Sequence, residues 1–243
     1  MPHSDLHSHR ASCHEVSADC KAMARSALLG HLGIATGSGV AYFLIVFLLQ
    51  MLLFYAVPGN GALSLLLSEL MSILLGILAG VLQYGLFFVN LKLQFRQEVV
   101  LSDLFLGFRE NTDKLVKIYA FLAVLQTLCL LPSLLVSMLV TGKNADLLYW
   151  LFLALGLVWY LFVDLTFFAA GYLLLDYPSL SARDALKKSR RLMKHHRLQL
   201  FWMELSFLPL WLLVLCSFGI VGIWVMAYQN AAMAAFYRKQ MEG

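Results

Sequence analysis

The sequence predicts an all-α membrane protein: a polytopic bundle of six transmembrane helices, with amphipathic helices at its cytoplasmic interface. Two observations favour this fold class. Hydrophobic residues make up 61% of the 243 residues and charged residues only 13%, whereas soluble domains carry about 25% charged residues. Long apolar segments also alternate with short polar ones. Because unpaired backbone groups are costly in lipid, apolar segments of about 20 residues are expected to be helices.

The chain divides into a short tail and a single membrane domain. Residues 1–20 are polar and are expected to be a disordered cytoplasmic tail, and residues 21–243 form the membrane domain. The tail carries soft metal ligands, but their spacing matches no closed zinc pattern, so neither a metal nor another cofactor is expected. These ligands are His3, His7, His9, Cys13, His14 and Cys20. The expected spans are 38–57, 66–90, 115–140, 147–175, 198–216 and 220–237.

A polar or amphipathic segment precedes each pair of spans. Residues 21–37 and a segment that begins at Ser102 have the apolar spacing of interfacial helices. Pro58-Gly59-Asn60-Gly61 and Thr141-Gly142-Lys143-Asn144 predict tight turns between spans. Pro132 and Pro209 each remove a backbone donor within a span and are expected to kink it.

Residues 176–207 hold the densest charge. Pro178 ends the fourth span, and Ser181 with Asp184 forms a capping box that begins an amphipathic helix. Its cations are expected to contact anionic lipid headgroups on the cytoplasmic face, and the alternative is a solvated basic face. These cations are Arg183, Lys187, Lys188, Arg190, Arg191, Lys194 and Arg197.

The distribution of positive charge predicts the orientation. On the expected spans, 17 of the 18 Lys and Arg fall on one side and Lys143 alone falls on the other. By the positive-inside rule, both termini are expected in the cytoplasm and the protein in the cell membrane.

Two acids, Asp164 and Glu204, are expected at membrane depth and are the candidates for an intramembrane polar site. Asp164 lies near the middle of the fourth span, where it is either a proton or cation site or a packing residue that is protonated or hydrogen-bonded. Glu204 lies seven residues after Arg197 on the same helix face, a spacing that favours an interfacial pair. The amides expected to hydrogen-bond between spans are Gln83, Asn90, Gln126, Gln229 and Asn230.

The function remains open at this point. The sequence has no zinc-protease, serine-hydrolase or P-loop motif, and neither enzyme activity nor nucleic-acid binding is expected. The leading hypothesis is a structural or accessory protein that acts on lipid or on a membrane-protein partner, which includes a second copy of itself. A small-solute or ion transporter or channel that uses Asp164 is the alternative, and a lipid-acting membrane enzyme is the least favoured.

Several motifs occur in an order that resembles a known family. They resemble bacterial six-span membrane proteins grouped as domain of unknown function 975, over residues 21–237, and are most specific from Asp176 onward. The resemblance implies the six-span topology and no established activity. The motifs are Gly107-Phe108, Leu131-Pro132, Tyr172–Pro178, Ala185–Lys194, Phe201–Phe207, Gly219–Trp224 and Phe236-Tyr237.

Overall fold

The computed structural model describes residues 13–56, 62–139 and 145–242, which form helices joined by turns with no strand among them. The helices are α1 (Cys13–Leu28), α2 (Leu32–Ala56), α3 (Ala62–Gln94), η1 (Leu101–Phe105), α4 (Leu106–Arg109), α5 (Thr112–Leu139), α6 (Ala145–Phe167), α7 (Ala170–Asp176), α8 (Ala182–Met193), α9 (Arg197–Leu205), α10 (Leu208–Cys216) and α11 (Gly222–Glu242). The predicted turns at 58–61 and 141–144 lie outside the described residues.

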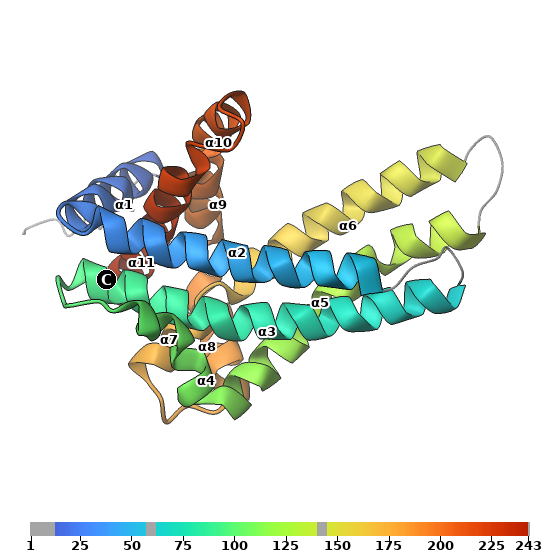
Figure 1. Ribbon diagram of the computed structural model, residues 1–243, viewed down its shortest axis with the longest axis horizontal. Coiled ribbons are helices and arrows are strands. Elements are labelled where there is room, and N and C mark those ends of the chain that lie inside the picture. The colour runs from blue at the N-terminus through green and yellow to red at the C-terminus, as the bar shows by residue number, and fades with distance from the viewer. Residues whose placement is uncertain (1–12, 57–61, 140–144, 243) are drawn as a thin grey trace, which may run out of the picture.

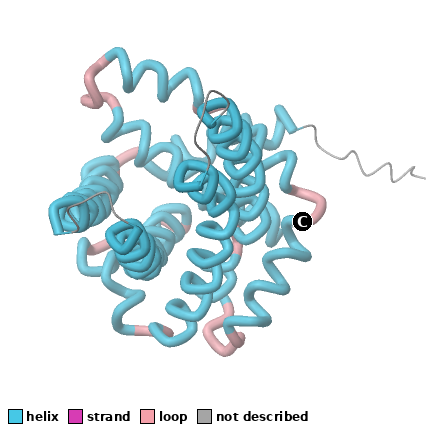
Figure 2. The backbone as a smooth tube through the Cα atoms, turned by 90° about the vertical axis from the view of Figure 1, so that its right-hand side faces the viewer, coloured by secondary structure: helices cyan, strands magenta, loops and turns pink. Residues whose placement is uncertain are grey.

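The helices are arranged as three hairpins. They are α2 with α3, α5 with α6, and α9–α10 with α11, and the far ends of α6 and α10 point away from each other (Figure 1). The perpendicular view shows the helices and the short loops that join them (Figure 2). A shorter helix precedes each hairpin: α1, η1–α4 and α8 respectively. This repeats the order of amphipathic segment and span pair in the sequence.

Five segments of the described chain are long and apolar enough to cross a membrane, and they confirm an all-α fold with several candidate spans. They are Leu32–Ala56, Leu66–Gln94, Thr112–Ser137, Asp146–Asp176 and Arg197–Cys216. The sixth predicted span, 220–237, is not among them. Its helix α11 begins at Gly222, carries Gln229-Asn230 near its middle and ends in charged residues, which lowers its mean hydropathy.

Helix α11 packs in the interior of the fold. It contacts α1, α2, α3 and α10, and every side chain from Ala231 to Tyr237 is buried. The ring of Tyr172 in α7 stacks between two other rings and so joins α11 to α3 and α7. Its centroid lies 4.2 Å from that of Phe87 in α3 and 4.8 Å from that of Tyr237 in α11. The Tyr237 hydroxyl also donates a hydrogen bond to Asp176 Oδ2 at 2.5 Å.

The tail prediction is wrong for residues 13–20, which form the first two turns of α1. Val16, Cys20 and Ala24 recur once per turn and are buried. They give α1 an apolar stripe that packs against α9 and α11. Of the six tail ligands, Cys20 is fully buried, and His3, His7 and His9 lie outside the described residues.

Two of the predicted spans are broken helices. The fourth is interrupted between α6 and α7 at Phe168-Ala169, and the fifth between α9 and α10 at Ser206-Phe207. Pro209 lies in the first turn of α10, where its missing N–H leaves no hydrogen bond unmade. The Lys21 ammonium of α1 donates to the Ser206 carbonyl at 3.1 Å and lies 4.7 Å from the Phe207 ring centroid. Helix α5, in contrast, runs through Pro132 without a break.

The predicted amphipathic helix is α8, and its N-cap is confirmed. Ser181 Oγ accepts a hydrogen bond from the Asp184 N–H at 3.2 Å and donates one to Asp184 Oδ2 at 2.7 Å. Helix α8 buries Ala185, Ser189 and Met193 against α6 and its neighbours. Within this contact the Ser189 hydroxyl donates to the Thr166 carbonyl at 3.2 Å. The opposite face of α8 carries the cations.

Candidate functional site

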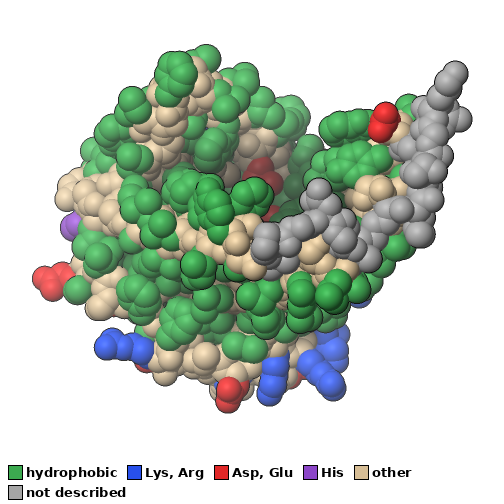
Figure 3. Space-filling view, turned by 45° about the vertical axis from the view of Figure 1, so that its right-hand side comes forward, with side chains coloured by type: hydrophobic (Ala, Val, Ile, Leu, Met, Phe, Trp, Pro, Cys, Tyr) green, Lys and Arg blue, Asp and Glu red, His purple; other side chains and the backbone are tan. Residues whose placement is uncertain are grey.

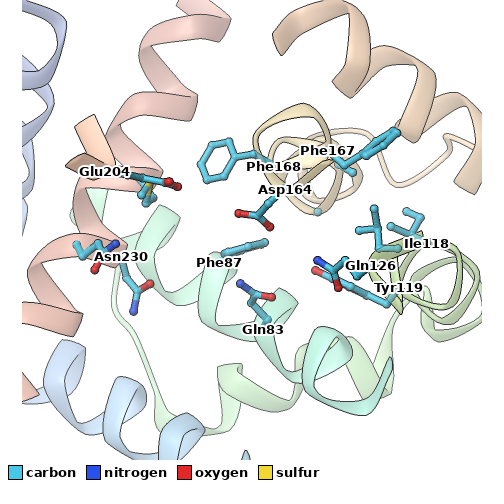
Figure 4. Close-up of a pocket in the computed structure, with 15 residues that line it drawn as sticks. Gln83, Phe87, Ile118, Tyr119, Gln126, Asp164, Phe167, Phe168, Glu204 and Asn230 are labelled. Atoms are coloured by element: carbon cyan, nitrogen blue, oxygen red, sulfur yellow. The ribbon is translucent and has the colours of Figure 1, made fainter. Parts of the chain in front are cut away.

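A polar cavity lies where the three hairpins meet. Its volume is about 210 Å³, and its lining comes from α3, α5, the α6–α7 break, α9 and α11. Among the 15 lining residues are both acids singled out in the sequence and four of the five amides (Figure 4). These polar residues are Gln83, Gln126, Asp164, Glu204, Gln229 and Asn230.

The two acids enter the cavity from the ends of two helices. Asp164 lies in the last turn of α6, and Glu204 lies in the last turn of α9. In Figure 4 the carboxyl group of Glu204 points toward Asp164, and Asp164 projects into the space above Phe87 and Gln83. Neither carboxyl group forms a hydrogen bond or ion pair with a described residue. Both are therefore available to a ligand.

The cavity is open to one face of the molecule. Helices surround Asp164, but its side chain is exposed to the cavity, which is large enough to admit water. The space-filling view shows acidic atoms deep in a hollow between largely apolar walls, whereas Lys and Arg gather along the lower edge (Figure 3). The acids and the basic surface thus lie on different parts of the protein.

The expected pair between Glu204 and Arg197 does not form. The Arg197 guanidinium carbon lies 4.6 Å from the Phe162 ring centroid instead, in a cation–π contact with α6, and its Nε is buried without a hydrogen-bond partner. Glu204 faces the cavity. Arg197 therefore contacts α6 instead of pairing with Glu204 within α9. Glu204 lines the cavity together with Asp164 and does not form an ion pair at the membrane interface.

The amide side chains predicted to bond between spans differ in their hydrogen-bond partners. Gln229 Oε1 accepts a hydrogen bond from Trp211 Nε1 at 3.0 Å, which joins α11 to α10 as predicted. Asn90 was expected to bond between spans, but it donates to the Leu86 carbonyl of its own helix at 2.8 Å. Gln83 and Asn230 line the cavity near Asp164 and Glu204. There their amide groups can donate to or accept from a ligand.

The lining has a single sign of charge. It contains two acids and no Lys, Arg, His or Cys. The α6–α7 break lies at its edge, so the negative end of the α6 dipole adds to the field of the two carboxylates. Two uncompensated carboxylates at this depth would be costly. Protons or a bound cation would lower this cost.

A second cavity adjoins the first. It has a volume of about 550 Å³, lies between α3, α5 and α6, and shares Gln126 with the first cavity. Its polar lining includes Glu69, an acid that the sequence analysis missed although it falls within the predicted span 66–90. The other polar residues of this lining are Ser72, Thr127, Ser133, Ser137 and Tyr149.

Six of the seven predicted lipid-contact residues lie on α8 or directly after it, and the seventh, Arg197, begins α9. Six of the seven are exposed, and Arg197 is half-buried. Lys188 lies over the Tyr177 ring at 3.8 Å. Arg183, Lys187 and Arg190 line a groove that also includes Lys117 of α5.

Comparison with known proteins identifies the family but no characterised relative. No curated protein and no solved structure matches the chain. A family described as protein of unknown function (DUF975) matches residues 15–242, which nearly coincide with the described helices. Asp176 and Tyr237, two of the residues that carry the sequence resemblance to this family, hydrogen-bond to each other near the end of α11. The chain belongs to the DUF975 family of proteins of unknown function.

Proposed function

We propose that this membrane protein binds a small cation or cationic solute in the cavity of Asp164 and Glu204 and mediates its passage across the membrane. The observation that carries the proposal is the convergence of two acids and four amides, with no basic residue, between helices that the sequence places in lipid. The sequence alone favoured an accessory role. The presence of both acids in one cavity favours the transporter or channel alternative, because acids that only pack helices together need not line the same cavity.

The energetics of the site support a cationic ligand. Each ionised carboxylate at membrane depth costs about 3 kcal/mol on insertion scales, and two carboxylates in one cavity also repel each other. A bound cation would relieve both costs, whereas an anion would add to them. Phe87, Phe168 and Tyr119 also line the cavity, and aromatic faces stabilise organic cations by about 0.5–2 kcal/mol.

The second cavity supports the proposal, because it would continue the path of a cation from the first. Gln126 lines both cavities, and Glu69 lies in the far one. A cation that leaves Asp164 would therefore meet an amide and then a second acid, rather than an apolar barrier. Several weak sites in series, instead of one tight site, are what conduction requires.

We infer six crossings with both ends in the cytoplasm. Gln240 Nε2 near the end of α11 lies 3.4 Å from Gln199 Oε1 at the start of α9, so α11 returns to the side from which α9 leaves. Lys239 forms an ion pair with Asp19 of α1 at 2.6 Å, which brings the two ends of the described chain to this same side. Because its neighbours bury α11 from Ala231 to Tyr237, this part of the helix can cross with fewer apolar residues than the other five segments.

The experiment is a cation titration of purified protein in neutral detergent, followed by unfolding temperature. The probes are K⁺, guanidinium and tetramethylammonium at millimolar concentrations. A ligand at ten times its Kd stabilises by about 1.4 kcal/mol, which raises Tm by about 3–5 °C for a chain of this size. Asp164→Asn and Glu204→Gln are expected to abolish the rise.

The matched control is Asp146→Asn. Asp146 lies on α6, as Asp164 does, but it is exposed in the first turn and lines neither cavity. It is expected to leave the rise unchanged. In proteoliposomes, uptake of the stabilising cation is expected with the wild type and with Asp146→Asn only.

A Tm that responds to no probe, or equally in wild type and Asp164→Asn, would contradict the proposal. The accessory role would then be the better hypothesis, and copurification of a stable membrane-protein partner would test it. The enzyme hypothesis would use the same two carboxyl groups, since Asp and Glu also act as general acids and bases.

A further inference from the structure

A groove of mixed character lies on the basic side of the protein, between α5, the end of α6 and α8. Its volume is about 490 Å³. Four cations surround it, and its apolar lining comes from Phe121, Phe167, Ala182 and Leu186. We propose that this groove binds one anionic phospholipid, with the phosphate among the cations and an acyl chain along the apolar wall. The cations are Lys117, Arg183, Lys187 and Arg190.

The cations converge from two helices. Arg183, Lys187 and Arg190 are spaced by four and three residues, so they share one face of α8. Lys117 comes from α5, across the groove. All four are exposed, and none forms an ion pair with a described residue. Their charges are therefore free to meet a phosphate, which Arg can bind through two parallel hydrogen bonds.

The apolar wall is the reason to choose a lipid over a soluble phosphate. The rings of Phe121 and Phe167 meet edge to face at 5.9 Å, and Phe121 is 48% exposed. Both belong to candidate membrane spans. An acyl chain would cover this apolar surface, whereas an inorganic phosphate would leave it uncovered.

The groove divides the cations of α8 into two classes. Lys188, Arg191 and Lys194 are also exposed, but they do not line it. A basic face that attracts lipid only through its summed charge would use every exposed cation alike. A site in the groove uses Lys187 and Arg190 but not their neighbours, and it also requires Lys117, which lies outside the basic stretch of the sequence.

Phe167 connects this site to the polar cavity. It lines both, and it lies three residues after Asp164 on α6. A lipid in the groove would therefore contact the wall of the acidic cavity. The lipid site does not rest on the proposed cation site, since each has its own ligand and its own residues.

The test uses the full chain in neutral detergent, titrated with phosphatidylglycerol, with phosphatidylcholine, or with sodium phosphate. Unfolding temperature reports binding, and each variant is first compared without lipid to establish that it folds. The decisive pair is Lys187→Gln/Arg190→Gln against Lys188→Gln/Arg191→Gln. Each double variant removes one Lys and one Arg at the same spacing, one residue apart on the same helix.

Phosphatidylglycerol is expected to raise Tm more than phosphatidylcholine does, and phosphate alone is expected to have no effect. The groove variant should need about tenfold or more lipid for the same rise, and Lys117→Gln should also weaken binding. The Lys188→Gln/Arg191→Gln control should titrate as the wild type does. Equal losses in the two double variants, equal effects of the two lipids, or an equal effect of phosphate would each overturn the proposal.

Discussion

Replacement of Gly80 by alanine tests the helix contact beside the cavity. A Cβ atom added at Gly80 would lie 2.2 Å from Tyr119 Cδ1 and 2.3 Å from its Cγ. The Tyr119 ring therefore lies directly against the backbone of α3, and Tyr119 lines the acidic cavity. Gly76, one turn earlier on α3, has only Ala123 Cβ near it, at 3.7 Å, which is an ordinary contact.

The two glycines give opposite expectations. Gly76→Ala introduces no clash and gains up to about 1 kcal/mol of helix propensity. Gly80→Ala has the same gain but forces Tyr119 and α5 away from α3, and such overpacking costs about 1–3 kcal/mol or more. We expect Gly80→Ala to unfold several degrees below Gly76→Ala in the same detergent, since about 1 kcal/mol corresponds to about 2–4 °C at this chain length.

A double-mutant cycle identifies the cause. Tyr119→Ala removes the ring, so Gly80→Ala made in that background is expected to lose its cost. Thermal unfolding followed by fluorescence measures all four proteins. Equal Tm values for Gly76→Ala and Gly80→Ala, or a cost of Gly80→Ala that persists without the ring, would refute the packing argument.

Three further predictions concern the rest of the fold. A Cβ at Gly85 would lie 1.8 Å from the Leu104 carbonyl oxygen, a clash with backbone that no side chain can relieve, so Gly85→Ala is expected to abolish the folded, monodisperse peak in size-exclusion chromatography. Burial raises the pKa of the Cys20 thiol to about 11, so little reactive thiolate is present at pH 8. Maleimide should therefore leave Cys20 unmodified in the folded protein but label the less buried Cys13. Peptide mass spectrometry would measure both. Phe218 is 98% exposed in the α10–α11 turn. Phe218→Cys, made in a background without native cysteines, should react with a membrane-impermeant thiol reagent added outside intact cells. Labelling only after lysis would contradict the proposed topology.

The local features of the fold follow from the sequence. The capping box predicted the start of α8 at Ser181, and the polar turns separated segments that the structure shows as helices. These signals act within a few residues, through single hydrogen bonds and backbone preferences. The error at residues 13–20 arose because an amphipathic stripe of Val16, Cys20 and Ala24 resembles a polar segment until its packing partner α11 is known.

The cavity could be predicted residue by residue but not as a site. Asp164 and Glu204 were candidates because acids are rare in lipid, and the same rule would have singled out Glu69, which lines the second cavity. What the sequence lacked was the relative placement of helices. Seven-residue spacing put Arg197 and Glu204 on one face, but spacing along α9 carries no information on α6, whose Phe162 binds the guanidinium instead.

The acids and the helix breaks occur together, and this adds a structural reason to consider the cavity functional, beside the convergence of its polar residues. Asp164 lies four residues before the interruption at Phe168-Ala169, and Glu204 lies two residues before that at Ser206-Phe207. A break exposes the negative end of a helix beside the carboxylate, as in transporters whose cation sites lie at interrupted helices. Because neither packing nor solubility requires this coincidence twice, we expect cation binding to depend on the breaks as well as on the acids.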